Sequence, residues 1–345
     1  MTDHTSAQMF PHVIDSTTLS TYRACSHKAF RQYMQHWKPG EESVHLIAGG
    51  AFAKGLEVAR SAYFEGRFLR PAVQYSPEGK RSVTWLEEEC PAHDGDLALE
   101  VGTAALIAAY GDYQCPPESA KSLVRMAGAL EFYFSAYPLG EDGADPLLLP
   151  SGRHAIEFSF AEPLDVLHPV TGQPILYAGR ADMICNYAGG RYIEDDKTTT
   201  SLGASWARQW EMRSQFTGYT WAARRNGIEV DGTLIRGVSI LKTKYDTLQV
   251  ITNRPKWEVE RWYDQTCRDV ERWISEWKLG RYDYSLDGAC TEYGGCAFTT
   301  VCKSQNPEAF LPIYFHKRVW DPLLRQEMTV EEYEASWGHQ GKVEG

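Results

Sequence analysis

YAGRADMICNYAGGRYIEDDKTTT, from Tyr177 to Thr200, is the stretch of this chain that decides its fold. Two segments rich in apolar, aromatic and β-branched residues lie on either side of Ala188, Gly189 and Gly190. A Gly-Gly turn between two strand-like segments is typical of an antiparallel hairpin. The sequence therefore predicts that these two segments pair as neighbouring strands.

Acidic residues lie on both arms of this predicted hairpin. Side chains alternate between the faces of a strand, so Asp195 and Lys197 project from one side, and Glu194 and Asp196 from the other. With Asp182 on the first arm, two carboxylates and a lysine can converge. Paired carboxylates hold a divalent cation, and a lysine beside them can orient an attacking water and offset charge on a phosphate. A surface hairpin with solvated charges is the alternative.

Three short motifs follow one another in this part of the chain. They are Gly179-Arg180-Ala181-Asp182, then Asp195-Asp196-Lys197-Thr198, then Gln215 and Tyr219 within QFTGY. Their order and intervals resemble the PD-(D/E)XK nuclease superfamily, in particular its RecB-type exonuclease branch. The resemblance implies that Asp182 and Asp195 ligate a metal, that Lys197 positions water, and that Gln215 and Tyr219 contact substrate near the scissile phosphate. For Gln215 and Tyr219, a buried pair on one helix face that satisfies itself is the alternative.

The helix before the hairpin departs from that family's pattern. In RecB-type nucleases a helix after a Gly-rich turn usually supplies a histidine metal ligand. Here Gly49 and Gly50 are expected to interrupt the chain before the helix, and the matching position is Ala53. Glu57, one turn further on, is the nearest replacement as a third metal ligand and catalytic residue. An exposed helix acid is its alternative.

Hydrophobic periodicity predicts an α/β order of strands and helices. The resemblance implies that they form a PD-(D/E)XK restriction-endonuclease-like core, a mixed central sheet flanked by helices, with a helical insertion and a C-terminal cysteine-rich loop. We expect helices at 16–37, in the part of 46–64 that follows Gly49 and Gly50, and at 97–110, 120–137, 204–225 and 257–277. We expect strands at 154–160, 175–187, 191–198, 233–242 and 247–253. The expected domains are a single nuclease domain at 1–305 and a tail at 306–345. Within the nuclease domain, N-terminal helices occupy 16–65, the helical insertion 70–150, the catalytic core 151–285 and the metal loop 286–303.

Eight cysteines without a signal-peptide pattern favour thiols over disulfides. Cys290, Cys296 and Cys302 recur with five residues between neighbours, and a tetrahedral site needs a fourth ligand. This arrangement resembles RecB-type nucleases of the AddB type and some CRISPR-associated exonucleases, in which one cysteine before the core and three after it hold a 4Fe-4S cluster. The resemblance implies Cys25 as the fourth ligand, although the first interval is longer than that group's usual one. Zinc on the same four thiolates is the alternative, and the predicted structural cysteines are Cys90, Cys115, Cys185 and Cys267.

The net charge of -11 gives no global attraction to nucleic acid, so a DNA contact requires a local basic strip. The helix at 257–277 could stack bases through its tryptophans, but core packing is the favoured interpretation. A basic-aromatic run at 314–320 could likewise touch DNA or pack as an arm. No apolar run is long enough for a membrane span, and we expect a cytoplasmic protein, in the host cytoplasm if phage-encoded. The candidate strip residues are Arg208, Arg213, Arg224, Arg225, Lys242, Lys244, Arg254 and Lys256.

These observations favour a DNA exonuclease that uses Mg²⁺ or Mn²⁺ and acts in recombination, repair or end processing. Its expected substrate is single-stranded DNA or linear duplex ends, and a recombination or single-strand annealing protein is a possible partner. A catalytically weak or inactive nucleic-acid-binding subunit is the alternative, motivated by Ala53 and by the acidic charge. A zinc-stabilised protein with an accidental hairpin is a third, more remote, reading.

Overall fold

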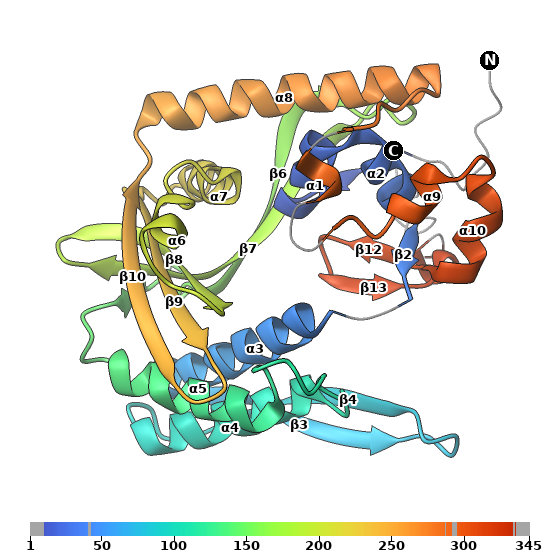
Figure 1. Ribbon diagram of the computed structural model, residues 1–345. Helices are drawn as coiled ribbons and strands as arrows, with labels where there is room; N and C mark the ends of the chain where they lie inside the picture. The colour runs from blue at the N-terminus through green and yellow to red at the C-terminus, as the bar shows by residue number, and fades with distance from the viewer. Residues whose placement is uncertain (1–9, 41–42, 287, 292–294, 334, 336–345) are drawn as a thin grey trace. The chain divides into compact units, whose positions relative to one another are not determined.

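The computed structural model describes residues 10–40, 43–286, 288–291, 295–333 and 335 (Figure 1). The chain divides into two compact units. Unit 1 comprises Met1–Glu41, Ser159–Gly179 and Trp257–Gly345, and unit 2 comprises Glu42–Phe158 and Arg180–Lys256. Among the described helices, none combines the length and the apolar composition that a bilayer crossing requires.

A mixed sheet of seven strands confirms the predicted α/β class. Its main path is β1-β7-β8-β9-β10, and β5 and β6 also pair with β7. The β7–β8 and β9–β10 pairs are antiparallel, whereas β1–β7 and β8–β9 are parallel. The strands are β1 (Val13–Ile14), β5 (Asp145–Pro146), β6 (Ile156–Leu167), β7 (Pro174–Tyr187), β8 (Gly190–Thr199), β9 (Gly232–Ile240) and β10 (Tyr245–Asn253).

The predicted hairpin is present as β7 and β8. Tyr187 pairs with Gly190, so Ala188 and Gly189 form a two-residue turn. Their φ angles are 48° and 83°, the left-handed values that a twisted hairpin needs at both central positions. The predicted antiparallel pairing is confirmed, but Gly190 belongs to β8 and not to the turn.

Helices cover the sheet of unit 2 on both faces (Figure 1). On one face, α3 (Val44–Glu65) and α5 (Leu123–Ala136) pack against β8 and β9, and a buried cluster that includes Phe52, Leu130 and Val238 fills the contact. On the other face lie α6 (Ala204–Arg208) and α7 (Ser214–Arg225). A further helix, α4 (Gly95–Tyr110), packs closely on α3, because a Cβ at Gly102 would lie 2.8 Å from the carbonyl oxygen of Gly55.

Unit 1 is built around the aromatic face of α8 (Lys256–Leu279). Trp273 is fully buried, with Phe10 and Tyr22 each at 5.0 Å between ring centroids. This confirms the core interpretation of the tryptophans, except at Trp257, which is 59% exposed. The remaining elements of this unit are α1 (Ser16–Ala24), α2 (Ser26–Ala29), a π-helix (Phe30–Met34), β2 (Trp37–Pro39), a 3-10 turn (Gly288–Cys290), α9 (Thr299–Lys303), α10 (Pro307–Tyr314), β11 (Phe315–Lys317), β12 (Val319–Asp321) and β13 (Gln326–Met328).

Two predicted helix boundaries are wrong. The helix expected at 16–37 is broken at Cys25, whose extended backbone (φ -162°, ψ 111°) ends α1 and begins α2. The helix expected at 204–225 ends at Arg208 and restarts after Arg213, where ψ is 117°. Hydrophobic periodicity does not reveal such breaks, because the apolar residues keep a similar spacing on both sides.

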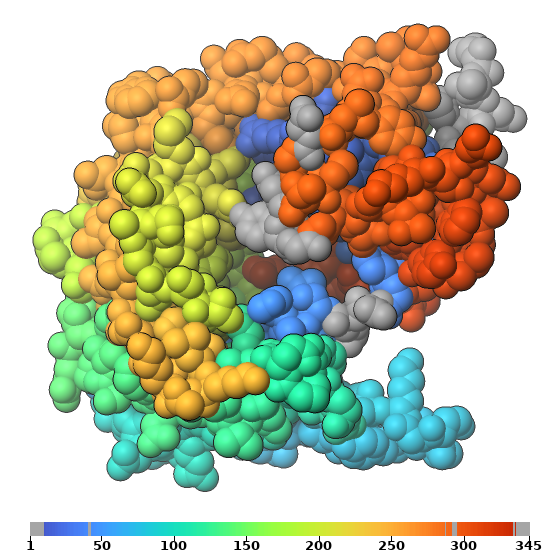
Figure 2. Space-filling model, in the orientation of Figure 1, coloured from blue at the N-terminus to red at the C-terminus, as the bar shows by residue number. Residues whose placement is uncertain are grey.

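Two further predictions are wrong: the interruption at Gly49 and Gly50, and the all-helical character of the insertion. Gly49 and Gly50 lie inside α3 and do not interrupt it, because tertiary packing overrides their weak helix propensity. In the region expected to be a helical insertion, α4 and α5 are present, but the segment before them forms an exposed hairpin of β3 (Arg67–Tyr75) and β4 (Arg81–Glu89) (Figure 2). The turn at 76–79 is the signal for this hairpin, with Gly79 at φ 78°.

Candidate active site

The two predicted carboxylates face each other where β7 and β8 separate. The last paired residues before the opening are Met183 and Glu194, which are directly opposite. Asp182 and Asp195 come next on their strands, and alternation turns both to the other face of the sheet. Lys197, two residues further along β8, shares that face and forms an ion pair with Asp195. The sequence-predicted triad is therefore brought together at one end of the hairpin.

Burial shifts the pKa values of all three side chains of this site. Desolvation raises the pKa of Asp195 to about 7, against the opposing effect of Lys197, and Asp182 raises it further. The pKa of Asp182 is also raised by burial. Burial lowers the pKa of Lys197, but Asp195 and Asp182 outweigh it and bring the value to about 12. One fixed cation thus faces two buried carboxylates, and a second cation would stabilise their charged forms.

The donor set fits a hard divalent cation. Asp195 Oδ1 is paired with the ammonium group of Lys197, and its carboxylate faces that of Asp182. Mg²⁺ is usually held by one or two carboxylates, with waters and substrate phosphates completing its shell. Within the described part of the chain, no group of three or more His, Cys, Asp or Glu side chains is arranged to hold a metal. Asp182 and Asp195 are the two carboxylates of this site that could contribute to such a shell.

The third predicted ligand, Glu57, does not join that pair as a metal-binding group. Its carboxylate forms an ion pair with Lys54 on the same helix, at 2.7 Å. The ammonium group of Lys54 in turn lies over the ring of Trp85, 4.8 Å from its centroid. A local partner therefore holds the Glu57 side chain on α3.

Helix α7 brings the last two predicted residues to the same face of the sheet. Gln215 Nε2 donates to the hydroxyl of Tyr219 at 3.2 Å, so the self-satisfying pair of the alternative interpretation is formed. Tyr219 is also close enough to Lys197 to raise its pKa, and the Lys197 ammonium lies 5.9 Å from the ring centroid of Phe216. The pair thus stands beside the lysine of the site.

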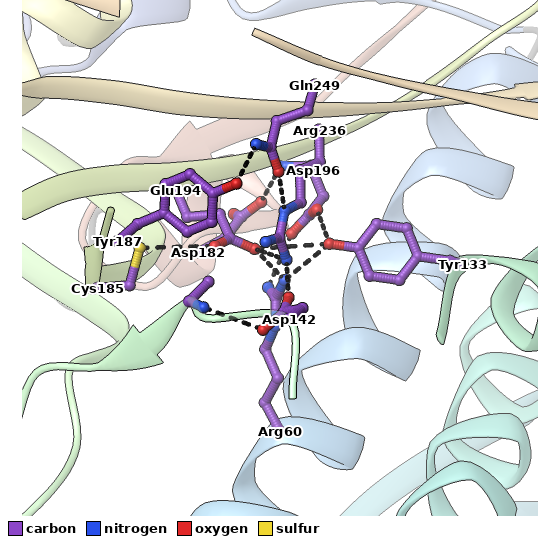
Figure 3. Close-up of polar contacts among 11 residues, drawn as sticks. Arg60, Tyr133, Asp142, Asp182, Cys185, Tyr187, Glu194, Asp196, Arg236 and Gln249 are labelled. Carbon is purple, nitrogen blue, oxygen red and sulfur yellow. Dashed lines mark hydrogen bonds and ion pairs between the residues drawn. The ribbon is translucent and has the colours of Figure 1, made fainter. Parts of the chain in front are cut away.

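A buried ionic network lies on the opposite face of β8, and sequence reasoning missed most of it (Figure 3). Arg60 on α3 contacts Glu194 at 2.5 Å and Asp196 at 2.7 Å, and its side chain is only 3% exposed. Arg236 on β9 contacts Glu194 at 3.3 Å and Asp142 at 2.5 Å. The signal was available: Glu194 and Asp196 were predicted to point away from the site, and acids buried there require cations.

Lys121 is a second residue near β8 that the sequence did not single out. It is 2% exposed, and its ammonium donates to Thr198 Oγ1 at 2.9 Å. Burial lowers its pKa to about 8. This lysine therefore fixes the end of β8, one residue beyond Lys197.

The four predicted cluster cysteines lie in one neighbourhood of unit 1. Desolvation raises the pKa of Cys302 to about 11, and Cys296, Cys25 and Cys290 raise it further. All four are free thiols. As placed, they do not form a ligating group, and the Cys290 thiol instead donates to the carbonyl of Ser285 at 3.2 Å. The donor types suit iron–sulfur or zinc, but the described geometry is not that of a closed site.

The predicted basic strip is only partly available for DNA. Arg254 is 1% exposed and donates to Thr217 Oγ1 and to the carbonyl of Trp210. Arg224 is half-buried and donates to the carbonyl of Val230. These two arginines hold the fold of unit 2, which is a correction to the predicted strip. The members that are exposed are Arg208, Arg213, Arg225, Lys242, Lys244 and Lys256.

Comparison with known proteins gives fold-level likeness only. No family model matches the chain, and no curated protein matches it. Among solved structures, it is similar to a "Putative exonuclease" from Eubacterium rectale, at 12% identity and a TM-score of 0.45, over 84% of this chain and 90% of that one. It is also similar to SSO0001, at 17% identity and a TM-score of 0.26, over 44% of this chain and 60% of that one. Likenesses this distant assign no activity.

Proposed function

We propose that this chain is a metal-dependent DNA exonuclease that hydrolyses phosphodiester bonds. The observation that carries the proposal is the convergence of Asp182, Asp195 and Lys197 at the opening of β7 and β8. Asp182 and Asp195 would hold Mg²⁺ or Mn²⁺, which when bound supplies a Lewis acid and lowers the pKa of water. Lys197 orients the attacking water and offsets charge on the phosphate, while Gln215 and Tyr219 hold the substrate.

Asp195→Asn should abolish Mn²⁺-dependent DNA cleavage, because the amide keeps the shape of the carboxylate but loses its charge. We would incubate the parent and the variant with end-labelled linear duplex, linear single strand and a covalently closed circle. An exonuclease digests the linear forms and leaves the circle intact. Glu57→Gln is the matched control, since Glu57 pairs with Lys54 and should be dispensable. Equal digestion by the parent and Asp195→Asn would contradict the proposal.

A catalytically weak DNA-binding subunit is the second candidate function. Two observations favour it: Ala53 stands where RecB-type nucleases usually have a histidine, and among the described residues no group of three or more His, Cys, Asp or Glu side chains could hold a metal, since Glu57 pairs with Lys54. The same assay separates the two candidates when it is combined with a DNA-binding measurement in EDTA. Tight binding by the parent without cleavage in Mn²⁺ would establish the subunit role.

We further propose that Cys25, Cys290, Cys296 and Cys302 hold a 4Fe-4S cluster that braces unit 1. Their shared neighbourhood around Cys302 supports this, and zinc is the competing metal. Anaerobically purified protein should contain iron and acid-labile sulfide in equal amounts. Cys302→Ser should lose iron and unfold at a lower temperature. Cys267→Ser, in α8, should keep the iron content and the unfolding temperature of the parent. Zinc without iron would favour the zinc site, and the absence of both metals would contradict any metal here.

A further inference from the structure

The carboxylate of Asp182 is fixed by the backbone of the facing strand. Regular pairing of β7 and β8 ends at Met183 and Glu194, so beyond that point the backbone amides of β8 lose their partners on β7. The amide N–H of Asp196 instead donates to Asp182 Oδ2 at 3.0 Å. The orientation of Asp182 therefore depends on where β8 holds the amide of Asp196.

Two helices fix that amide from the opposite face. The Asp196 side chain is 1% exposed, and each of its oxygens has its own donor. Arg60 Nη1 on α3 donates to Oδ2 at 2.7 Å, and the hydroxyl of Tyr133 on α5 donates to Oδ1 at 2.5 Å (Figure 3). Tyr133 also accepts from Arg60 Nη2 at 3.1 Å, so the two donors hold each other. The position of Asp196 is thus set by charge-assisted hydrogen bonds.

The geometry points to Arg60 and Tyr133 as positioning residues that act through Asp196 on the Asp182 carboxylate. The chain of contacts runs from the helices to the Asp196 side chain, through its backbone, to Asp182. Partners behind a metal ligand set its orientation, and their loss typically weakens metal binding by about 10- to 100-fold. This inference rests on the proposed function, since it names residues that orient a ligand of the same proposed cation site.

Tyr133→Phe tests the inference, because it removes the donor to Asp196 and keeps the ring. Mn²⁺ binding, measured by isothermal titration calorimetry without DNA, should weaken about 10-fold. Tyr137→Phe is the matched control: its ring centroid lies 4.3 Å from the Arg236 guanidinium in the same cluster, and its hydroxyl is hydrogen-bonded to Thr247, whereas Asp196 acts on it only through its charge. Its Mn²⁺ affinity should equal that of the parent. DNA binding in EDTA should be unchanged in both variants.

A second variant keeps the test open if Tyr133→Phe does not fold. Asp196→Asn retains the backbone N–H but weakens the hold of Arg60, and it should weaken Mn²⁺ binding in the same direction. Folded variants that bind Mn²⁺ as tightly as the parent would overturn the positioning role alone. If Asp182→Asn binds Mn²⁺ as well as the parent, the cation site itself is wrong, and both the proposed function and this inference fail. The Asp182→Asn arm therefore distinguishes the two failures.

Discussion

Lys197→Met should reduce Mn²⁺-dependent cleavage of linear DNA by about 10²- to 10⁴-fold, the usual range for loss of a positioned proton-handling group. Methionine keeps the length of the side chain and removes its charge. Lys197 forms an ion pair with Asp195, and Tyr219 lies near it. The variant should therefore still bind DNA while it loses the group that orients the attacking water. Single-turnover rates at saturating Mn²⁺ measure the chemical step directly.

Lys80→Met controls for the loss of one positive charge, because Lys80 is exposed at the turn between β3 and β4. Its cleavage rate should match that of the parent. The removal of Lys197 also leaves Asp182 and Asp195 without their fixed cation, so metal-free protein could lose stability. Saturating Mn²⁺ removes this effect, since the added cation compensates the two carboxylates. A parental rate in Lys197→Met under these conditions would exclude the lysine from the chemistry.

Strand alternation carried most of what the sequence predicted about this site. A period of two places Asp195 and Lys197 on one face of β8 and Glu194 on the other, whatever the rest of the fold does. The two-residue turn of Ala188 and Gly189 then fixes which residues on β7 face them. Local rules of this kind need no knowledge of distant residues, and the structure confirms them.

Long-range partners could not be predicted in the same way. Arg60 is separated from Glu194 by 134 positions, and nothing in the local pattern of α3 marks it as buried with charge. Glu57 shows the opposite case: helical spacing allows it to reach the site, and in the structure its carboxylate pairs with Lys54, three residues away. The resemblance to a family supplied the roles of residues but not these competing contacts.

Helix breaks were missed for a related reason. Cys25 leaves the helical conformation and caps α2 with its own thiol, which accepts from the amide of Lys28 at 3.4 Å. The apolar spacing on either side remains compatible with one helix, so periodicity gives no warning. The hairpin of β3 and β4 was missed because its strands are largely exposed and therefore lack a strong apolar alternation.

Arg60→Met should lower the free energy of unfolding by about 3–5 kcal/mol at pH 8, the cost of leaving buried charges without their partner. Arg60 is 2% exposed and neutralises Glu194 and Asp196, which are themselves buried. Arg67→Met is the matched control, because Arg67 also contacts two carboxylates, those of Glu65 and Glu87, but is 30% exposed. It should cost at most about 1 kcal/mol. Urea unfolding followed by circular dichroism gives both values.

The pH dependence identifies the buried acid as the cause. Burial raises the pKa of Glu194 to about 7 in the folded protein, even with Arg60 opposing it. Loss of Arg60 raises that pKa further, whereas the unfolded-state pKa stays near its usual value of about 4.3. Below pH 7, Glu194 is protonated in both folded proteins, so it contributes nothing to the difference between their free energies of unfolding. Above pH 7, Glu194 loses its proton in the folded parent but keeps it in the folded variant, so the difference grows. The deficit of Arg60→Met should therefore be larger at pH 8 than at pH 6, and an equal deficit at both would show that lost packing, and not the unpaired charge, destabilises the variant.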